Sequence, residues 1–83
     1  MRSVAELKVN EPAVIAQVLS NDSVAKYVAL GLVPGTSIMV KRHSPLKDAY
    51  YLKVGNHYVG IREDEAKLIA VEDLSSRDLS ADR

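Results

Sequence analysis

The segment spanning residues 30–46 constrains the fold of this chain more than any other, because it encodes two sharp changes of direction around one short strand. It reads Leu-Gly-Leu-Val-Pro-Gly-Thr-Ser-Ile-Met-Val-Lys-Arg-His-Ser-Pro-Leu. Gly31 can end a helix, since a residue without Cβ adopts positive φ at little cost. Pro34-Gly35 suits the two central positions of a type II turn. The Ile and Val residues that follow favour a strand, which Pro45 ends because proline cannot donate to a sheet.

Alternating and capping patterns predict the other elements. We expect a helical turn over 4–7, a helix over 22–30, a helical or 3₁₀ turn over 62–67, and strands over 13–19, 37–42, 50–54, 57–61 and 68–71. Gly55-Asn56 is the clearest hairpin signal, because it separates two alternating runs by two residues. We expect Ile38 and Val40 to face inward. Tyr50, Leu52 and Val54 share one face of the next strand, and His57, Val59 and Ile61 share one face of the strand after it.

The helix over 22–30 has a side-chain N-cap signal and an apolar stripe. Residues 21–23, Asn-Asp-Ser, offer oxygen acceptors for the first N–H groups of the helix. Val24, Val28 and Leu32 recur at i, i+4 and i+8, with Tyr27 beside them. This spacing predicts that these side chains form the buried face of the helix.

Five short strands in 83 residues predict a small barrel, because closure removes exposed strand edges. A chain of this length supports a single hydrophobic core. We therefore expect one domain over residues 1–72 and a polar, flexible tail over 73–83. Strand periodicity alone does not separate an SH3-like barrel from an oligonucleotide-binding barrel.

Composition excludes several classes of function. The chain has no cysteine, so disulfides, thiolate metal sites and cysteine catalysis are absent. No apolar run approaches the ~20 residues of a membrane-spanning helix, and no signal peptide precedes the first predicted element, so we expect a cytoplasmic protein without membrane insertion. A formal net charge of zero is unlike the basic footprint of nucleic-acid binders. No phosphate-binding loop or Ser-His-Asp pattern is present, so we predict that the chain is not an enzyme.

Three motifs with this separation resemble one family. Leu-Gly-Leu-Val-Pro-Gly-Thr stands at 30–36, Ser-Pro-Leu at 44–46 and Ile-Arg-Glu-Asp-Glu-Ala at 61–66. Together they resemble the FeoA-like domains, small cytosolic components of bacterial ferrous iron transport, over roughly residues 4–72. The resemblance implies a mainly β, SH3-like five-stranded barrel with one inserted α-helix and a short N-terminal helical turn. The matching structural positions are Leu30, Gly31, Leu32, Pro34, Gly35, Pro45, Arg62 and Ala66.

The resemblance also implies a function. A FeoA-like chain would be a non-enzymatic interaction module that binds the cytosolic part of the ferrous iron permease FeoB and modulates it at the inner face of the membrane, without carrying iron. SH3-like barrels use their loops for recognition, so we expect the loop over 44–49 to be the interface. Leu46 would be its apolar anchor, with Lys41, Lys47 and Tyr51 nearby. The oligomeric state stays open, a homo-oligomer included.

Two alternatives remain open. The chain could be a detached regulatory domain related to the C-terminal domain of iron-dependent repressors. It could also be a small nucleic-acid-binding barrel that stacks bases on Tyr51 and Tyr58. The candidate metal ligands are the two histidines, His43 and His57, and the carboxylates of residues 63–65. The two histidines are not spaced as metal-binding histidine pairs are, so we expect no metal site and no cofactor.

Overall fold

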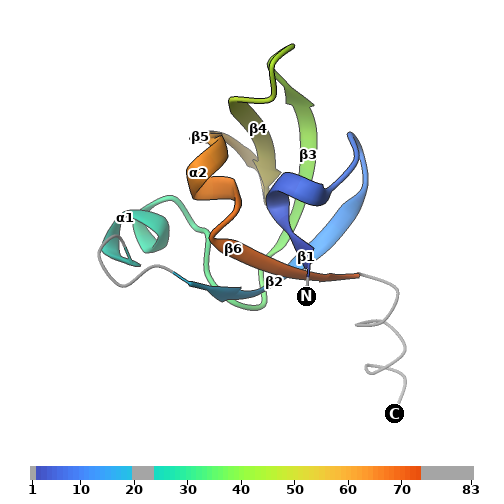
Figure 1. Ribbon diagram of the computed structural model, residues 1–83. Coiled ribbons are helices and arrows are strands. Elements are labelled where there is room, and N and C mark those ends of the chain that lie inside the picture. Colours follow the sequence, from blue (N-terminus) through green and yellow to red (C-terminus); the bar gives the residue numbers. More distant parts are fainter. Residues whose placement is uncertain (1, 20–23, 74–83) are drawn as a thin grey trace.

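One antiparallel sheet of six strands, in the order β1-β6-β2-β3-β4-β5, forms the frame of the molecule. This computed structural model describes residues 2–19 and 24–73. The strands are β1 (Arg2–Ser3), β2 (Pro12–Val18), β3 (Ser37–His43), β4 (Ala49–Val54), β5 (His57–Arg62) and β6 (Ile69–Asp73). The helices are the 3₁₀ turn η1 (Val4–Glu6), α1 (Val24–Ala29) and α2 (Glu63–Ala66). Figure 1 shows the sheet curving around a core, with α1 set apart at one side.

The predicted mainly β class is confirmed, and each of the five expected strands lies within two residues of an observed one. β1 is a further strand of two residues that the sequence analysis did not predict. It extends the sheet because Arg2 and Ser3 pair with Val71 and Ala70 of β6. β6 itself continues through Asp73, whereas the rest of the predicted tail lies outside the described residues.

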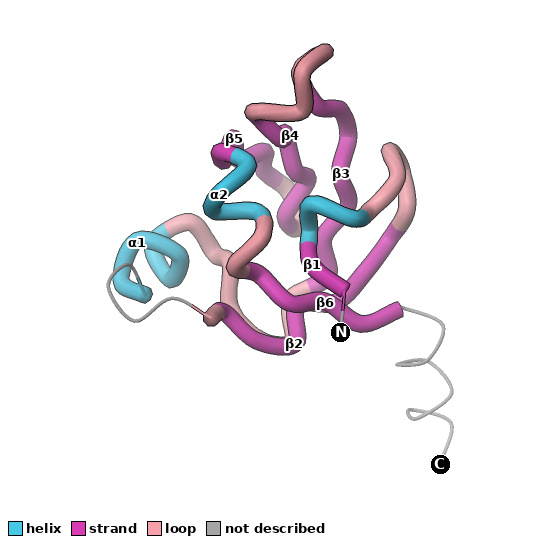
Figure 2. The backbone as a smooth tube through the Cα atoms, viewed as in Figure 1, coloured by secondary structure: helices cyan, strands magenta, loops and turns pink. Residues whose placement is uncertain are grey.

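The core lies between the curved sheet and the two short helices η1 and α2. These helices lie side by side over the sheet, and α2 also contacts β4 and β5 (Figures 1 and 2). The largest fully buried side chains are Val4, Val14, Ile15, Tyr27, Leu32, Val40, Leu52 and Ile69. Among the described residues no polar or charged residue is buried, so the core is held by apolar packing.

Two irregularities in strand register help the sheet to curve. One lies between Ile15 and Gln17 on β2, and the other between Val40 and Arg42 on β3. A β-bulge bends its strand and increases its twist, which is what closing a small sheet around a core needs. The bulge on β3 leaves Lys41 as the extra residue.

The segment between α1 and β3 has the conformation that its glycines allow. Leu32 N–H donates to Tyr27 O (2.8 Å) and Gly31 N–H to Val28 O (3.0 Å), which together form the Schellman motif of a helix end. Gly31 has a φ of 82°. A type II turn follows, with Gly35 at a φ of 92°.

The predicted buried face of the helix is wrong for two of its four residues, Val24 and Val28. Tyr27 alone is the buried residue of α1, whereas Val24 and Val28 are 47% and 56% exposed. The helix ends at Ala29 and Gly31 turns the chain, so Leu32 reaches the core from outside the helical period. His57, predicted on the same strand face as Val59 and Ile61 and next to the hairpin turn, is exposed. The N-cap predicted at 21–23 lies outside the described residues.

Candidate functional site

The loop between β3 and β4 is built around the Ser44 side chain. Ser44 Oγ accepts hydrogen bonds from Asp48 N–H (3.0 Å) and Ala49 N–H (3.1 Å), and it also contacts the Asp48 carboxylate. Ser44 N–H donates to Ala49 O (2.9 Å) and Lys47 N–H to Ser44 O (2.9 Å). These bonds close a tight loop that projects beyond the sheet at the top of Figure 1. The loop is therefore a fixed platform for its outer side chains.

Leu46 and Lys47 are presented by this loop. Leu46 is 86% exposed, which is the largest exposed fraction among the large apolar residues described. Lys47 has a φ of 59°, a left-handed conformation that turns the chain back toward β4. A cleft of about 390 Å³ lies beside the loop, between Lys47 and His43 on one side and residues 5–9 on the other. The predicted anchor thus stands in solvent next to a concave surface.

The outer face of β4 gathers Tyr51 with partners from both neighbouring strands. Tyr51 pairs with Arg42 on β3 and with Gly60 on β5. The Arg42 guanidinium carbon lies 4.8 Å from the Tyr51 ring centroid, a cation–π distance. Lys41, in the bulge, is exposed beside this pair. The sequence groups Arg42 with Lys41, Lys47 and Lys53 in the predicted hairpin region, but it does not predict the contact between Arg42 and Tyr51, because only the bulge brings Arg42 opposite the ring.

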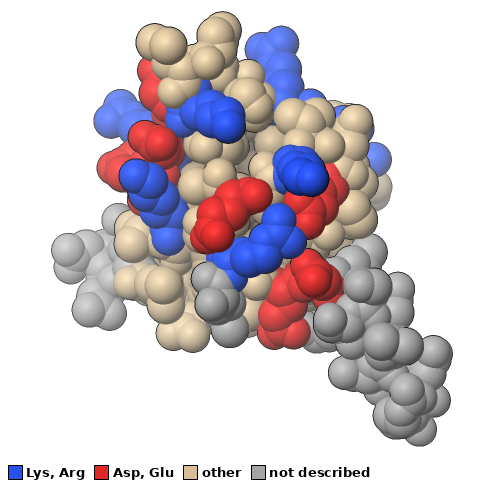
Figure 3. Space-filling view, turned by 45° about the vertical axis from the view of Figure 1, so that its right-hand side comes forward, with Lys and Arg blue, Asp and Glu red and all other residues tan. Residues whose placement is uncertain are grey.

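Charge is distributed unevenly over the described chain. Over the face shown in Figure 3, Lys and Arg side chains lie next to Asp and Glu side chains. The strands β3, β4 and β5, in contrast, contain no acidic residue. Their cationic residues are Lys41, Arg42, Lys53 and Arg62. This three-strand face therefore attracts anionic groups.

The acidic residues predicted at 63–65 form the first turn of α2. Glu65 Oε1 accepts from the Arg62 backbone N–H (2.8 Å), and Glu65 Oε2 forms an ion pair with Lys26 of α1. The Arg62 N–H and then the Lys26 ammonium hold the pKa of Glu65 below its usual value. Ala66 is fully buried beneath this turn. These contacts give the acidic turn a structural role, which is to join α2 to β5 and α1.

Both imidazoles bond to backbone carbonyls. His43 Nδ1 donates to Ser44 O (2.9 Å), and His57 Nε2 donates to Leu30 O (3.2 Å). His57 thereby covers the Leu30–Gly31 segment, and a Cβ added at Gly31 would lie 3.5 Å from its ring. No group of three or more His, Cys, Asp or Glu residues that could hold a metal ion occurs within residues 2–19 and 24–73.

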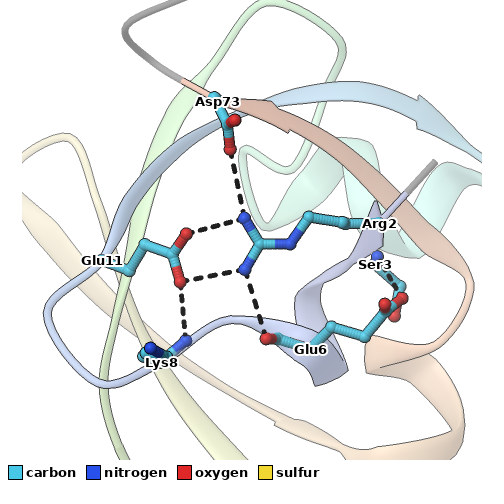
Figure 4. Close-up of polar contacts among 6 residues, drawn as sticks. All are labelled: Arg2, Ser3, Glu6, Lys8, Glu11 and Asp73. Carbon is cyan, nitrogen blue, oxygen red and sulfur yellow. Dashed lines mark hydrogen bonds and ion pairs between the residues drawn. The ribbon is translucent and has the colours of Figure 1, made fainter.

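A charged cluster that the sequence analysis missed fixes the N-terminal strand (Figure 4). Arg2 Nη1 and Nη2 donate to both carboxylate oxygens of Glu11, at 2.7 and 3.0 Å, and Nη1 also donates to Asp73 Oδ1 at 3.1 Å. Glu11 accepts in addition from Lys8 N–H at 2.9 Å. The bonds from Arg2, which have the largest effect, and the bond from Lys8 N–H lower the pKa of Glu11 to about 2. The cluster ties β1, the turn before β2 and the end of β6 together.

A second, smaller hollow lies between α1 and β2. This groove of about 190 Å³ is apolar and is lined in part by Val24, Val28 and Pro34. Val24 and Val28 are exposed in this groove, so it is a second apolar surface beside the Leu46 loop. Within the described segments, no helix combines the length and apolar character that crossing a membrane requires.

Known proteins share this sequence pattern and fold. The family model described as the FeoA domain matches residues 2–73. The FeoA protein from Chlorobium tepidum is 30% identical with a TM-score of 0.82, over 88% of this chain and 70% of that chain. Iron(II) transport protein A from Clostridium thermocellum is 33% identical with a TM-score of 0.83, over 89% of this chain but only 46% of that chain. A search of curated proteins gives no significant match.

Solved structures of lower identity extend the likeness in fold. The zinc complex of FeoA from Stenotrophomonas maltophilia, described as a prokaryotic SH3 domain protein, is 23% identical over 87% of this chain and 91% of that chain, with a TM-score of 0.74. IdeR from T. acidophilum, 23% identical, shares the fold over 87% of this chain and 33% of its own length, with a TM-score of 0.75. The barrel is thus SH3-like, and with the family model covering nearly all of its described residues, the chain belongs to the FeoA domain family.

Proposed function

We propose that this chain is a non-enzymatic accessory protein of bacterial ferrous iron transport, which binds the cytosolic part of a FeoB permease at the inner face of the membrane and modulates it. Its membership of the FeoA family supports the transport context. The binding role is supported by the exposure of Leu46, a large apolar side chain that is 86% exposed on a rigid loop. An apolar side chain held in solvent gains free energy when a partner covers it.

The neighbours of Leu46 suit a protein interface. Lys47 lies in the same loop, and Lys41 and Tyr51 lie on the strands that the loop connects. Basic side chains at a rim speed association with an acidic partner and lose that effect as salt rises. The cleft beside Lys47 offers a concave surface for a partner side chain.

The experiment is a titration of labelled protein with the purified cytosolic domain of FeoB, followed by amide NMR. We expect shifts over residues 41–53 and loss of binding in Leu46→Asp, because a buried unpaired carboxylate opposes docking. Val28→Asp is the matched control, since Val28 is also exposed and apolar but lies on α1 at the second hollow. If Val28→Asp loses binding while Leu46→Asp keeps it, the interface lies at the hollow beside α1 and not at the Leu46 loop. Unchanged spectra of the wild type would contradict FeoB binding.

A second candidate is favoured by the fold shared with metal-dependent repressors. A manganese-dependent transcriptional repressor has a TM-score of 0.80 to this chain at 10% identity, over 36% of its own length. On this hypothesis the chain is a detached regulatory domain that contacts a separate DNA-binding protein. The neighbouring genes discriminate between the two, because a permease gene supports the transport role and a repressor gene supports the regulatory role.

A further inference from the structure

β5 is the long uncovered edge of the sheet. It stands at one end of the strand order and pairs with β4 alone in the described part of the chain, whereas the strand at the other end, β1, has only two residues. An edge strand presents unused backbone N–H and C=O groups to any extended chain that approaches it. β5 therefore has the geometry required for strand addition.

The register identifies the backbone groups that point outward. Val54 and His57 flank the two-residue turn between β4 and β5, so they form a hydrogen-bonded pair. Pairs alternate along an antiparallel ladder, so Tyr58 and Gly60 direct their N–H and C=O groups away from β4. Arg62 follows the same alternation, and its outward N–H is satisfied by Glu65 Oε1 at 2.8 Å. The α2 turn thus closes one end of the edge and leaves Tyr58 and Gly60 for a partner.

Gly60 makes this edge accessible. A glycine has no side chain, so its exposed surface is backbone, and Gly60 is exposed. On the outer face a Cβ added at Gly60 would lie 3.5 Å from the Tyr51 ring, which is an ordinary contact distance. Tyr58 is 66% exposed next to it and pairs with Lys53. An added strand would therefore contact the exposed backbone of Gly60, with the rings of Tyr51 and Tyr58 on either side.

Charge indicates which kind of strand fits. No acidic residue occurs in β3, β4 or β5, and four Lys and Arg residues do. A second copy of β5 would bring another cationic sheet against this one, which opposes pairing between copies. A nucleic acid would satisfy the charges but offers no peptide groups to continue the ladder. The face therefore favours an extended peptide that carries carboxylates.

We infer that β5 binds an acidic, extended segment of a protein partner as an added strand, with backbone hydrogen bonds at Tyr58 and Gly60 and carboxylates near Arg62 of β5 and Lys53 of β4. The inference rests on the proposed function in that the partner is the source of the segment. It adds a second contact on the sheet edge, distinct from the Leu46 loop.

The test uses a synthetic peptide of about ten residues with alternating Glu and Val, and the matching Lys and Val peptide as the charge control. We expect the acidic peptide to slow hydrogen exchange of the Tyr58 and Gly60 amides in the wild-type chain. Tyr58→Pro removes an outward N–H without touching the β4 ladder, so its Kd should be at least about fivefold weaker than that of Tyr58→Val, which keeps the donor.

Any of several results would overturn the inference. They are unchanged amide exchange in the wild type when the acidic peptide is added, and binding of the Lys peptide as tight as that of the acidic peptide. Equal affinity of Tyr58→Pro and Tyr58→Val for the acidic peptide, when both variants are folded, is a further one. So is displacement of the acidic peptide by a single-stranded oligonucleotide that does not protect the two amides. Concentration-dependent sedimentation of the chain alone, with the same amides protected, would assign the edge to a second copy and would also overturn it. If the Pro variant does not fold, the wild-type exchange measurement decides by itself.

Failure of this inference is distinguishable from failure of the proposed function. If FeoB binds through Leu46 while the acidic peptide leaves the Gly60 amide unprotected, the edge assignment fails and the transport role stands. If the peptide protects Gly60 while FeoB does not bind, the edge assignment stands and FeoB is not the partner.

Discussion

At the residue scale, the Arg2–Glu11 pair makes the stability of the N-terminal strand depend on pH. Glu11 has a pKa of about 2 in the folded chain, against 4.5 as its ordinary value, because Arg2 and Lys8 N–H bond to its charged form. A carboxylate with a lowered folded pKa adds stability that is complete above about pH 4.5 and is lost as the pH falls to about 2. We expect the free energy of unfolding to decrease through this window.

Glu11→Gln should remove part of that decrease. The variant is expected to be less stable than the wild type at pH 6 and to show a shallower fall between about pH 4.5 and about pH 2, measured by urea unfolding at several pH values. Glu72→Gln changes the net charge equally at an exposed position of β6 and is the matched control. Parallel pH profiles for the wild type and Glu11→Gln would show that the ion pair adds nothing.

At the element scale, the end of α1 depends on one left-handed residue. A Cβ added at Gly31 would meet its nearest neighbours at 3.5–3.6 Å, which is ordinary contact, so the strain of a substitution comes from the backbone φ of 82°. Gly31→Ala is therefore expected to lower the free energy of unfolding by about 1–2 kcal/mol in urea titrations. Gly31→Asn should cost less, because Asn tolerates this conformation better. Equal losses would point to steric contact with His57 instead.

The same element shows where sequence reasoning succeeds and where it stops. Local signals located the helix end, the turn and the hairpins, because Gly, Pro and short alternating runs restrict the backbone by themselves. The predicted buried face of α1 was right for Tyr27 and Leu32 and wrong for Val24 and Val28, which are exposed, since the apolar stripe continues past the point where Gly31 ends the helix. Within the six-residue helix only Tyr27 is buried, because tertiary packing selects the side that faces the core.

Contacts between residues far apart in the sequence could not be predicted, for a different reason. Arg2 and Asp73 are 71 positions apart and meet only because β1 pairs with β6. Arg42 lies opposite Tyr51 only because of the bulge at Lys41. Neither the pairing of a two-residue strand nor the position of a bulge has a signal in a single sequence. The Leu46 loop could be predicted as exposed, since a short Ser-Pro loop between two strands has little else to pack against.

At the scale of the whole molecule, the core that stabilises the fold is separate from the two surfaces proposed for recognition. The interior is apolar, and the described chain buries no charged group, so stability derives from packing around residues such as Ile15 and Leu52. The Leu46 loop and the β5 edge lie outside this core and are held by it. A partner can therefore act on the loop and edge without reorganising the core.

Two leucine truncations test that separation directly. A domain of 83 residues has a total stability of about 4–12 kcal/mol. Leu52 is fully buried, so Leu52→Ala should cost about 2–5 kcal/mol through lost contacts and a cavity, a large part of the whole. Leu46→Ala makes the same chemical change in solvent and should stay within about 0.5 kcal/mol of the wild type, while weakening FeoB binding. Thermal unfolding and the NMR titration together report both effects. A marked loss of stability in Leu46→Ala would mean that the loop belongs to the folded core, and the weaker binding of Leu46 variants would then reflect unfolding and not a lost contact.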